Sequence, residues 1–182
     1  MVVTHPITHV EGSTEPWVQD ILVVLLKALQ KESPNVLELG GFLGHTSARL
    51  AQAITEIGAG TLTVAEWDAE APERADAVQA RLEPFDVGSV RCHVVRDDAL
   101  KVIASLPNES LDFAFCDDDH TAAHVREELE ALLPKMAPGG LITGHDVFGS
   151  CALHEVFAQF GGYSLDFPRL GAAGGLGIIQ CR

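Results

Sequence analysis

The chain has 182 residues, of which 47% are hydrophobic and 6% aromatic, and its formal net charge is −14. This length fits one domain with a sizeable core. The negative charge argues against a nucleic acid or an anionic membrane as partner, because both attract proteins that gather Lys and Arg on one face.

The cysteines and the N-terminal region predict a cytoplasmic protein. The cysteines lie far apart without a Cys-x-x-Cys spacing, which favours a reduced setting over a disulfide framework. Residues 1–15 contain no basic start and no apolar run, so no signal peptide is predicted. The apolar run Ile21–Leu26 is too short to cross a bilayer. The four cysteines are Cys92, Cys116, Cys151 and Cys181.

Helix-like and strand-like segments alternate along the whole chain. The first half predicts a helix over Pro16–Leu29, a strand over Val36–Leu39, a helix ended by Gly58, a strand over Leu62–Ala65, a helix over Pro72–Leu82, a strand over Val90–Val95 and a short helix reaching Leu106. The second half predicts a strand over Leu111–Cys116, a helix over Ala122–Met136, a strand over Leu141–Gly144 after Pro138-Gly139-Gly140, a helix over Leu153–Phe160 and strands over Tyr163–Phe167 and Leu176–Gln180.

This alternation indicates the α/β class. We predict a doubly wound, Rossmann-like, mostly parallel sheet of seven strands with helices on both faces. A Gly/Ala-rich loop separates the last two strands, which predicts an antiparallel hairpin at the C-terminal end. We expect one domain over residues 1–182, with an N-terminal segment and helix over 1–34 and the core over 35–182.

The segment Val36–Ser47 reads as a buried strand, a glycine-rich turn and the start of a helix. Glycines let a backbone approach a ligand closely, and a helix N-terminus offers free N–H groups. The dinucleotide pattern G-x-G-x-x-G is absent, because Phe42 and His45 stand where glycines would follow Gly40. Glu38 precedes the turn and suits a cation better than a pyrophosphate. S-adenosylmethionine, which carries an ammonium and a sulfonium and no phosphate, fits this turn.

Acidic residues also follow the next two strands, where an open parallel sheet binds its ligands. Glu66 and Trp67 follow the second strand, and an acid at this place can accept hydrogen bonds from both ribose hydroxyls. Asp98 and Ala99 follow the third strand, where a carboxylate could accept from an adenine amino group.

The ends of the fourth and fifth strands carry Asp117–His120 and His145-Asp146. Neighbouring strands lie about 5 Å apart, and crowded carboxylates are costly without a cation. Carboxylate oxygens suit Mg²⁺ or Ca²⁺, whereas His145 as a ligand shifts the preference toward Mn²⁺, Fe²⁺, Co²⁺ or Zn²⁺. Two plainer interpretations stay open: Asp118 or Asp119 caps the following helix, and His145 is a packed core histidine.

His120 is the candidate general base. It lies three residues after Asp117, and a neutral imidazole can take the proton of a hydroxyl whose pKa a nearby cation lowers. His124 is a second candidate.

Three segments, Val36–Ala51, Leu111–His120 and Pro138–Asp146, together resemble the catechol O-methyltransferase-like branch of class I methyltransferases. Within it, the pattern D-x-x-H after the fourth strand is similar to metal-dependent small-molecule O-methyltransferases of secondary metabolism. The resemblance implies S-adenosylmethionine as cofactor, a divalent metal ion with Mg²⁺ foremost, and a small hydroxylated acceptor such as a phenol, a catechol or a natural product.

The resemblance also implies residue roles. Asp117, His145 and Asp146 would hold the metal, with His120 as base, although such families usually carry Asp-Asn or Glu-Asp where this chain has His-Asp. Thr46 would bind the cofactor's carboxylate. The implied cofactor-binding residues are Glu38, Gly40, Gly41, Phe42, Gly44, Thr46, Glu66, Trp67, Asp98, Ala99 and Asp117.

Other functions stay open. One is a metal-independent O- or N-methyltransferase that uses His120 alone, and another is a methyltransferase-fold protein that binds the cofactor without transferring methyl. The missing glycines disfavour a nicotinamide enzyme. The acceptor pocket can be covered by Met1–Glu15, Phe148–Cys151 and Gly171–Gly175, or completed by a neighbouring subunit of a homo-oligomer.

Overall fold

The computed structural model describes residues 14–67, 71–149, 152–166 and 174–182, which form one sheet in the order β3-β2-β1-β4-β5-β7-β6. The strands β1 to β5 pair in parallel, and β7 runs antiparallel to both β5 and β6. The predicted fold class, including the antiparallel C-terminal hairpin, is therefore confirmed. The strands are β1 Asn35–Leu39, β2 Gly60–Ala65, β3 Val90–Val95, β4 Leu111–Cys116, β5 Met136–His145, β6 Tyr163–Leu165 and β7 Leu176–Gln180.

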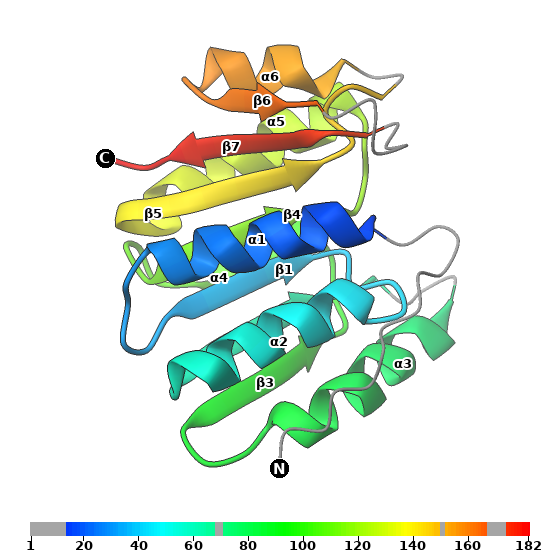
Figure 1. The fold of residues 1–182 in the computed structure, drawn as a ribbon. Coiled ribbons are helices and arrows are strands. Elements are labelled where there is room, and N and C mark those ends of the chain that lie inside the picture. Colours follow the sequence, from blue (N-terminus) through cyan, green and yellow to red (C-terminus); the bar gives the residue numbers. More distant parts are fainter. Residues whose placement is uncertain (1–13, 68–70, 150–151, 167–173) are drawn as a thin grey trace.

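Helices cover both faces of the sheet, α1 to α3 on one face and α4 to α6 on the other (Figure 1). No helix in the described part of the chain is long and apolar enough to cross a membrane. The helices are α1 Pro16–Ala28, α2 His45–Ile57, α3 Pro72–Leu82, α4 Ala99–Ser105, α5 Ala122–Leu132 and α6 Leu153–Gln159, with 3₁₀ turns η1 Glu83–Phe85 and η2 Leu133–Lys135.

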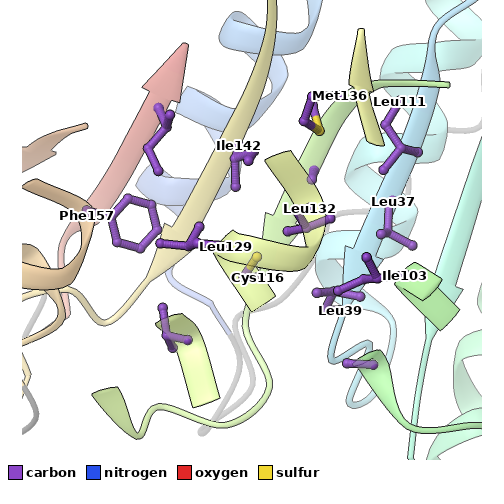
Figure 2. Packing of buried hydrophobic residues seen from close by; sticks show 14 of the residues in the cluster. Leu37, Leu39, Ile103, Leu111, Cys116, Leu129, Leu132, Met136, Ile142 and Phe157 are labelled. Carbon is purple, nitrogen blue, oxygen red and sulfur yellow. The ribbon is translucent and has the colours of Figure 1, made fainter. Parts of the chain in front are cut away.

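The central strand β4 shows why this sequence folds into three layers. All six of its residues are buried, as expected for a strand covered on both faces. Phe113 and Phe115 pack against the layer of α1 to α3, while Ala114 and Cys116 point into the opposite layer. Figure 2 shows that opposite layer, where Cys116 lies near leucines of α5.

Two predicted boundaries are wrong. The helix expected to reach Met136 ends at Leu132, because the 3₁₀ turn η2 follows it. The strand β5 then begins at Met136, before Pro138-Gly139-Gly140. These three residues form an irregularity within the strand, since its register against β4 shifts there. The Gly139 N–H donates to the Cys181 carbonyl at 2.9 Å. Pairing with the C-terminal segment therefore keeps these residues in the strand, although Pro and Gly usually interrupt one.

The hairpin strand β6 is shorter than predicted, since it ends at Leu165. The predicted end at Phe167 lies outside the described residues, as does most of the Gly/Ala-rich loop. Within the described chain Cys92, Cys116 and Cys181 carry free thiols, while Cys151 lies outside it.

Candidate active site

A cavity of about 880 Å³ opens at the carboxyl ends of β1, β2, β4 and β5. The arrowheads of β1 and β5 point to the right in Figure 1. Among the described residues that line the cavity, Arg74 is the only lysine or arginine. An excess of negative groups around a concave site favours a cationic ligand and disfavours a phosphate. The lining includes eight carboxylates: Glu15, Glu66, Asp97, Asp98, Asp117, Asp118, Asp119 and Asp146.

The turn after β1 contributes Gly40, Gly41 and Phe42 to the cavity wall. Gly40 has φ +82, and a Cβ there would lie 2.3 Å from the Asp117 carbonyl oxygen. Only glycine therefore lets the turn lie against the end of β4. Gly44 does not line the cavity; it precedes α2 at φ +78, with the Val78 Cα 3.0 Å from where its Cβ would stand. The structure thus places Gly44 against α3, and its predicted contact with the cofactor stays a prediction.

Glu38 is not among the described residues that line the cavity, and its predicted contact with a cofactor stays a prediction. Its side chain is fully buried, and neither carboxylate oxygen has a hydrogen-bond partner among the described residues. Burial raises the pKa of Glu38 to about 8, against a smaller lowering by Ser47. The carboxyl group is therefore mostly neutral near pH 7, so it does not supply the negative charge that the sequence suggested.

The other predicted cofactor residues line one side of the cavity. Glu66, at the end of β2, accepts a hydrogen bond from the Phe42 N–H at 2.7 Å. Burial raises the pKa of Glu66, although the backbone N–H groups of Phe42 and Gly41 counteract it. Trp67 is 52% exposed, and the Lys101 Nζ lies 5.7 Å from its ring centroid. This part of the wall also contains Asp98, the N-cap of α4, and Ala99, the first residue of that helix.

Thr46 lies at the N-terminal end of α2 and lines the cavity. Its hydroxyl donates to the Thr14 hydroxyl oxygen at 3.0 Å, and the Thr14 hydroxyl donates in turn to Asp117 Oδ2 at 2.6 Å. A chain of hydroxyls therefore connects the start of α2 with the end of β4.

Asp117 is the centre of a cluster of acids and imidazoles at the ends of β4 and β5. Its Oδ1 accepts from His145 Nδ1 at 3.1 Å and from His120 Nε2 at 3.2 Å. Burial raises the pKa of Asp117, but the hydrogen bonds from His120, His145 and Thr14 prevail, and the pKa is lowered overall. Asp117 is therefore a carboxylate at neutral pH.

His145 is buried between two carboxylates. Its Nδ1 faces Asp117, and its Nε2 donates to Glu15 Oε2 at 2.7 Å. Burial lowers the pKa of His145, but the hydrogen bonds to Asp117 and Glu15 outweigh it and raise the pKa to about 10. In the ligand-free protein His145 is thus an imidazolium that supplies positive charge among the carboxylates.

Asp146 completes the cluster from a strained backbone. Its φ of 54 lies in the left-handed region, which is uncommon for a residue with a side chain and is typical of functional sites. Its two oxygens lie 3.5 Å from His120 Nε2 and from His145 Nδ1. A Cβ on Gly174 would lie 1.9 Å from Asp146 Oδ1, so glycine at that position leaves room for the carboxylate.

The structure groups the potential metal ligands somewhat differently from the prediction. Ligand atoms of Asp117, His120 and His145 all lie within 4.8 Å of one another. His120 therefore lies among the predicted ligands Asp117, His145 and Asp146, and its role as base or as ligand becomes a question of chemistry. A second group is formed by Asp118, His124 and Glu128.

The helix-capping interpretation holds in part. Thr121 is the N-cap of α5, because its hydroxyl accepts from the His124 N–H at 3.4 Å. Asp119 accepts from the Thr121 N–H at 2.8 Å and so supports the cap. The carboxylate of Asp118 instead faces His124.

Sequence reasoning assigned no individual role to Thr14, Glu15, His45 or Arg74, all of which line the cavity. Nothing in residue spacing connects Glu15 with His145, 130 positions later. The only signal was that residues 1–15 could cover the pocket. Residues 1–13, 150–151 and 171–173, which belong to the segments expected to cover it, lie outside the described residues.

Comparison with known families adds one sequence match. A profile described as a methyltransferase domain matches residues 37–147. Among curated proteins, none matches the chain significantly.

Solved structures share the fold at low sequence identity. An O-methyltransferase candidate from Klebsiella pneumoniae has a TM-score of 0.76 and 19% identity, covering 94% of this chain and 83% of its own. An O-methyltransferase from Bacillus cereus in complex with S-adenosylhomocysteine has a TM-score of 0.69 and 18% identity, with coverages of 94% and 84%. The O-methyltransferase TomG from Streptomyces achromogenes, involved in tomaymycin synthesis and in complex with S-adenosylmethionine, has a TM-score of 0.69 and 21% identity, with coverages of 93% and 82%.

Proposed function

The chain belongs to the methyltransferase domain family, and we propose that it transfers the methyl group of S-adenosylmethionine to a hydroxyl of a small molecule with the help of a divalent cation. The acceptor class we propose is a phenol, a catechol or a hydroxylated natural product. The structurally similar O-methyltransferases, two of them in complex with S-adenosylhomocysteine or S-adenosylmethionine, support the cofactor and the oxygen acceptor.

The observation that carries this proposal is the charge of the cavity. Eight carboxylates and one arginine line it, at the strand ends where such a sheet binds its ligands. A dinucleotide or another phosphate compound would meet repulsion there. S-adenosylmethionine carries positive charge on its sulfur and its ammonium group, so this wall attracts it.

The described residues fit the cofactor. Glu66 offers a buried carboxylate at the cavity wall for the ribose hydroxyls, and Asp98 offers another beside the predicted adenine site. Gly40 and Thr46 lie where the methionine part would approach the start of α2. When bound, S-adenosylmethionine supplies a methyl group on a cationic sulfur. An acceptor oxygen attacks the methyl carbon in line with the sulfur, which leaves as the neutral thioether. The protein's contribution is to hold the two reactants in this alignment.

The cluster around Asp117 fits a divalent cation. Asp117 and Asp146 offer carboxylate oxygens, and His145 offers Nδ1, a set that suits Mn²⁺, Fe²⁺, Co²⁺ or Zn²⁺ as well as Mg²⁺. To act as a ligand, His145 must lose its Nδ1 proton, while Glu15 keeps the other proton on Nε2. A carboxylate on the far nitrogen is the usual partner of a metal-binding histidine. A bound divalent cation would lower the pKa of an acceptor hydroxyl.

His120 is placed to receive the acceptor's proton. Its ring is 37% exposed and faces the cavity, with Nε2 near both Asp117 and Asp146. The hydrogen bond to Asp117 raises the pKa of His120, which works against a base at neutral pH. A divalent cation bound by the neighbouring carboxylates would lower the pKa of His120 and so favour the neutral imidazole.

One observation favours a metal-independent transfer as the second candidate. The imidazolium of His145 already neutralises part of the acidic cluster from within the protein. In that case His120 alone would act on an oxygen or nitrogen acceptor.

The test is formation of S-adenosylhomocysteine from a panel of catechols and phenols, with chelator-treated protein and with added Mg²⁺ or Mn²⁺. We expect cation-dependent turnover that Asp146→Ala abolishes while the affinity for S-adenosylmethionine stays mostly intact. Glu130→Ala, an exposed carboxylate of α5, is the matched control. Full activity of Asp146→Ala in chelator would select the metal-independent reaction. Cofactor binding without turnover on any acceptor would favour a protein that does not transfer methyl.

A further inference from the structure

A buried acid on α5 has no part in the reaction described above. The Glu128 side chain is fully buried, and neither of its oxygens has a hydrogen-bond partner among the described residues. Burial, followed by the nearby charge of Asp118, raises the pKa of Glu128 to about 10. A buried carboxyl group without a hydrogen bond is costly, and native proteins rarely keep one without a water or an ion beside it.

Two further ligand groups face Glu128. His124 lies one helical turn earlier, on the same side of α5, with Nε2 3.4 Å from Glu128 Oε1. The same Nε2 lies 3.3 Å from Asp118 Oδ2, at the end of β4. Ligand atoms of all three residues lie within 4.8 Å of one another. The second oxygen of Asp118, Oδ1, is also buried without a hydrogen-bond partner.

We propose that Asp118, His124 and Glu128 bind a first-row transition-metal cation, with Zn²⁺, Co²⁺ and Mn²⁺ as the chemistry that fits. These ions take imidazole nitrogens and carboxylate oxygens as ligands, and the group offers one nitrogen and two carboxylates. The nitrogen ligand makes Mg²⁺ the weaker choice, since Mg²⁺ prefers oxygen ligands and retains waters. This site does not share a ligand with Asp117, His145 and Asp146, and it does not depend on the proposed methyl transfer.

The surroundings leave space for one more ligand. A small cavity of about 10 Å³ touches Asp118 and Glu128, although His124 does not line it. Apolar side chains such as Val125 and Phe157 border it, and so do Asp119, His120 and His145. That volume is close to the space of one water molecule. Three protein ligands and one water make the four-coordinate arrangement usual for Zn²⁺.

A cation here would connect the end of β4 with α5. The loop between Asp118 and His124 carries His120, the candidate base. Binding would therefore fix the loop from both sides and hold His120 near the cavity. In the absence of a cation, a proton shared between Asp118 and Glu128 would be the competing way to neutralise the group.

The experiment uses the chelator-treated full chain carrying Asp146→Ala, which weakens the neighbouring cluster. Co²⁺ is added, its visible absorption is followed, and native mass spectrometry counts the bound ions. We expect one bound Co²⁺ per chain and a melting temperature that rises with Co²⁺. Adding His124→Ala or Glu128→Gln should weaken binding at least about tenfold, whereas the exposed neighbour Glu127→Gln should leave it unchanged.

Either of two results would overturn the proposal. The first is no Co²⁺ bound by the Asp146→Ala chain, which would assign the buried group to a shared proton. The second is Co²⁺ binding that His124→Ala does not weaken, which would place the ion at Asp117, His120 and His145. Circular dichroism and melting curves verify that each variant is folded, and Glu128→Gln keeps the side-chain shape if His124→Ala does not fold.

Discussion

Replacing Glu38 by glutamine tests the reasoning about the buried end of β1. Burial raises the pKa of this carboxyl group from its ordinary value of 4.5 to about 8 in the folded protein. The unfolded chain ionises near the ordinary value, so between these two pH values the unfolded state alone loses its proton. The stability associated with the protonated group is therefore fully present below pH 4.5 and is lost as the pH rises to 8.

The magnitude follows from the same values. The folded and unfolded pKa values differ by about 3.5. At about 1.4 kcal/mol per pKa unit, the complete loss is on the order of 5 kcal/mol of unfolding free energy. Glutamine has the shape of the neutral acid and does not ionise, so the unfolding free energy of Glu38→Gln should not fall in this way as the pH rises.

Urea unfolding of both proteins at pH 5, 7 and 9, without cofactor, measures the effect. Every other titrating group is present in both proteins and largely cancels in the difference. We expect the unfolding free energy of Glu38→Gln, relative to that of the wild type, to rise by several kcal/mol between pH 5 and pH 9. The exposed control Glu32→Gln should show no such rise. A difference that stays constant over this range would mean that Glu38 is ionised in the folded protein and that burial does not raise its pKa.

Further predictions concern the cavity. Glu15→Gln should lower the affinity for Mn²⁺ by about 10- to 100-fold, as calorimetry would measure, because it weakens the group that orients His145; unchanged affinity would contradict this. His120→Ala should reduce turnover while Mn²⁺ affinity is kept, and a parallel loss of affinity would make His120 a ligand. Glu66→Gln should weaken S-adenosylmethionine binding by about tenfold or more, with turnover at saturation less affected. Gly40→Ala should lower the melting temperature strongly, because its Cβ would lie 2.3 Å from a backbone oxygen; a stable variant would show that the turn can move.

The fold could be predicted because its signals are local and mutually consistent. Helical and strand periods alternate from Pro16 to Gln180, and short apolar runs such as Leu111–Cys116 mark strands buried on both faces. The same reasoning placed acids at the strand ends, and the structure brings Asp117, His145 and Asp146 into contact there. The match to the methyltransferase domain over residues 37–147 confirms the resemblance to class I methyltransferases.

The remaining features depend on contacts that no local pattern encodes. Glu15 contacts His145 because Thr14 and Glu15, directly before α1, line the cavity, and residue spacing does not predict a contact between positions so far apart in the sequence. Glu38 is buried because alternation turns it toward the layer of α1 and α2, which a motif-based interpretation ignored. The Pro138-Gly139-Gly140 breaker lies within β5 because pairing with β7 stabilises it there.

Calorimetric titration of S-adenosylmethionine into chelator-treated protein measures whether the acidic cavity binds this compound. The titration is repeated with Mg²⁺ or Mn²⁺ present and with the Glu66→Gln variant. We predict binding in both conditions, weakened in the variant, together with a separate heat of cation binding that Asp146→Ala abolishes. No binding of S-adenosylmethionine to folded protein, with or without cation, would contradict the account.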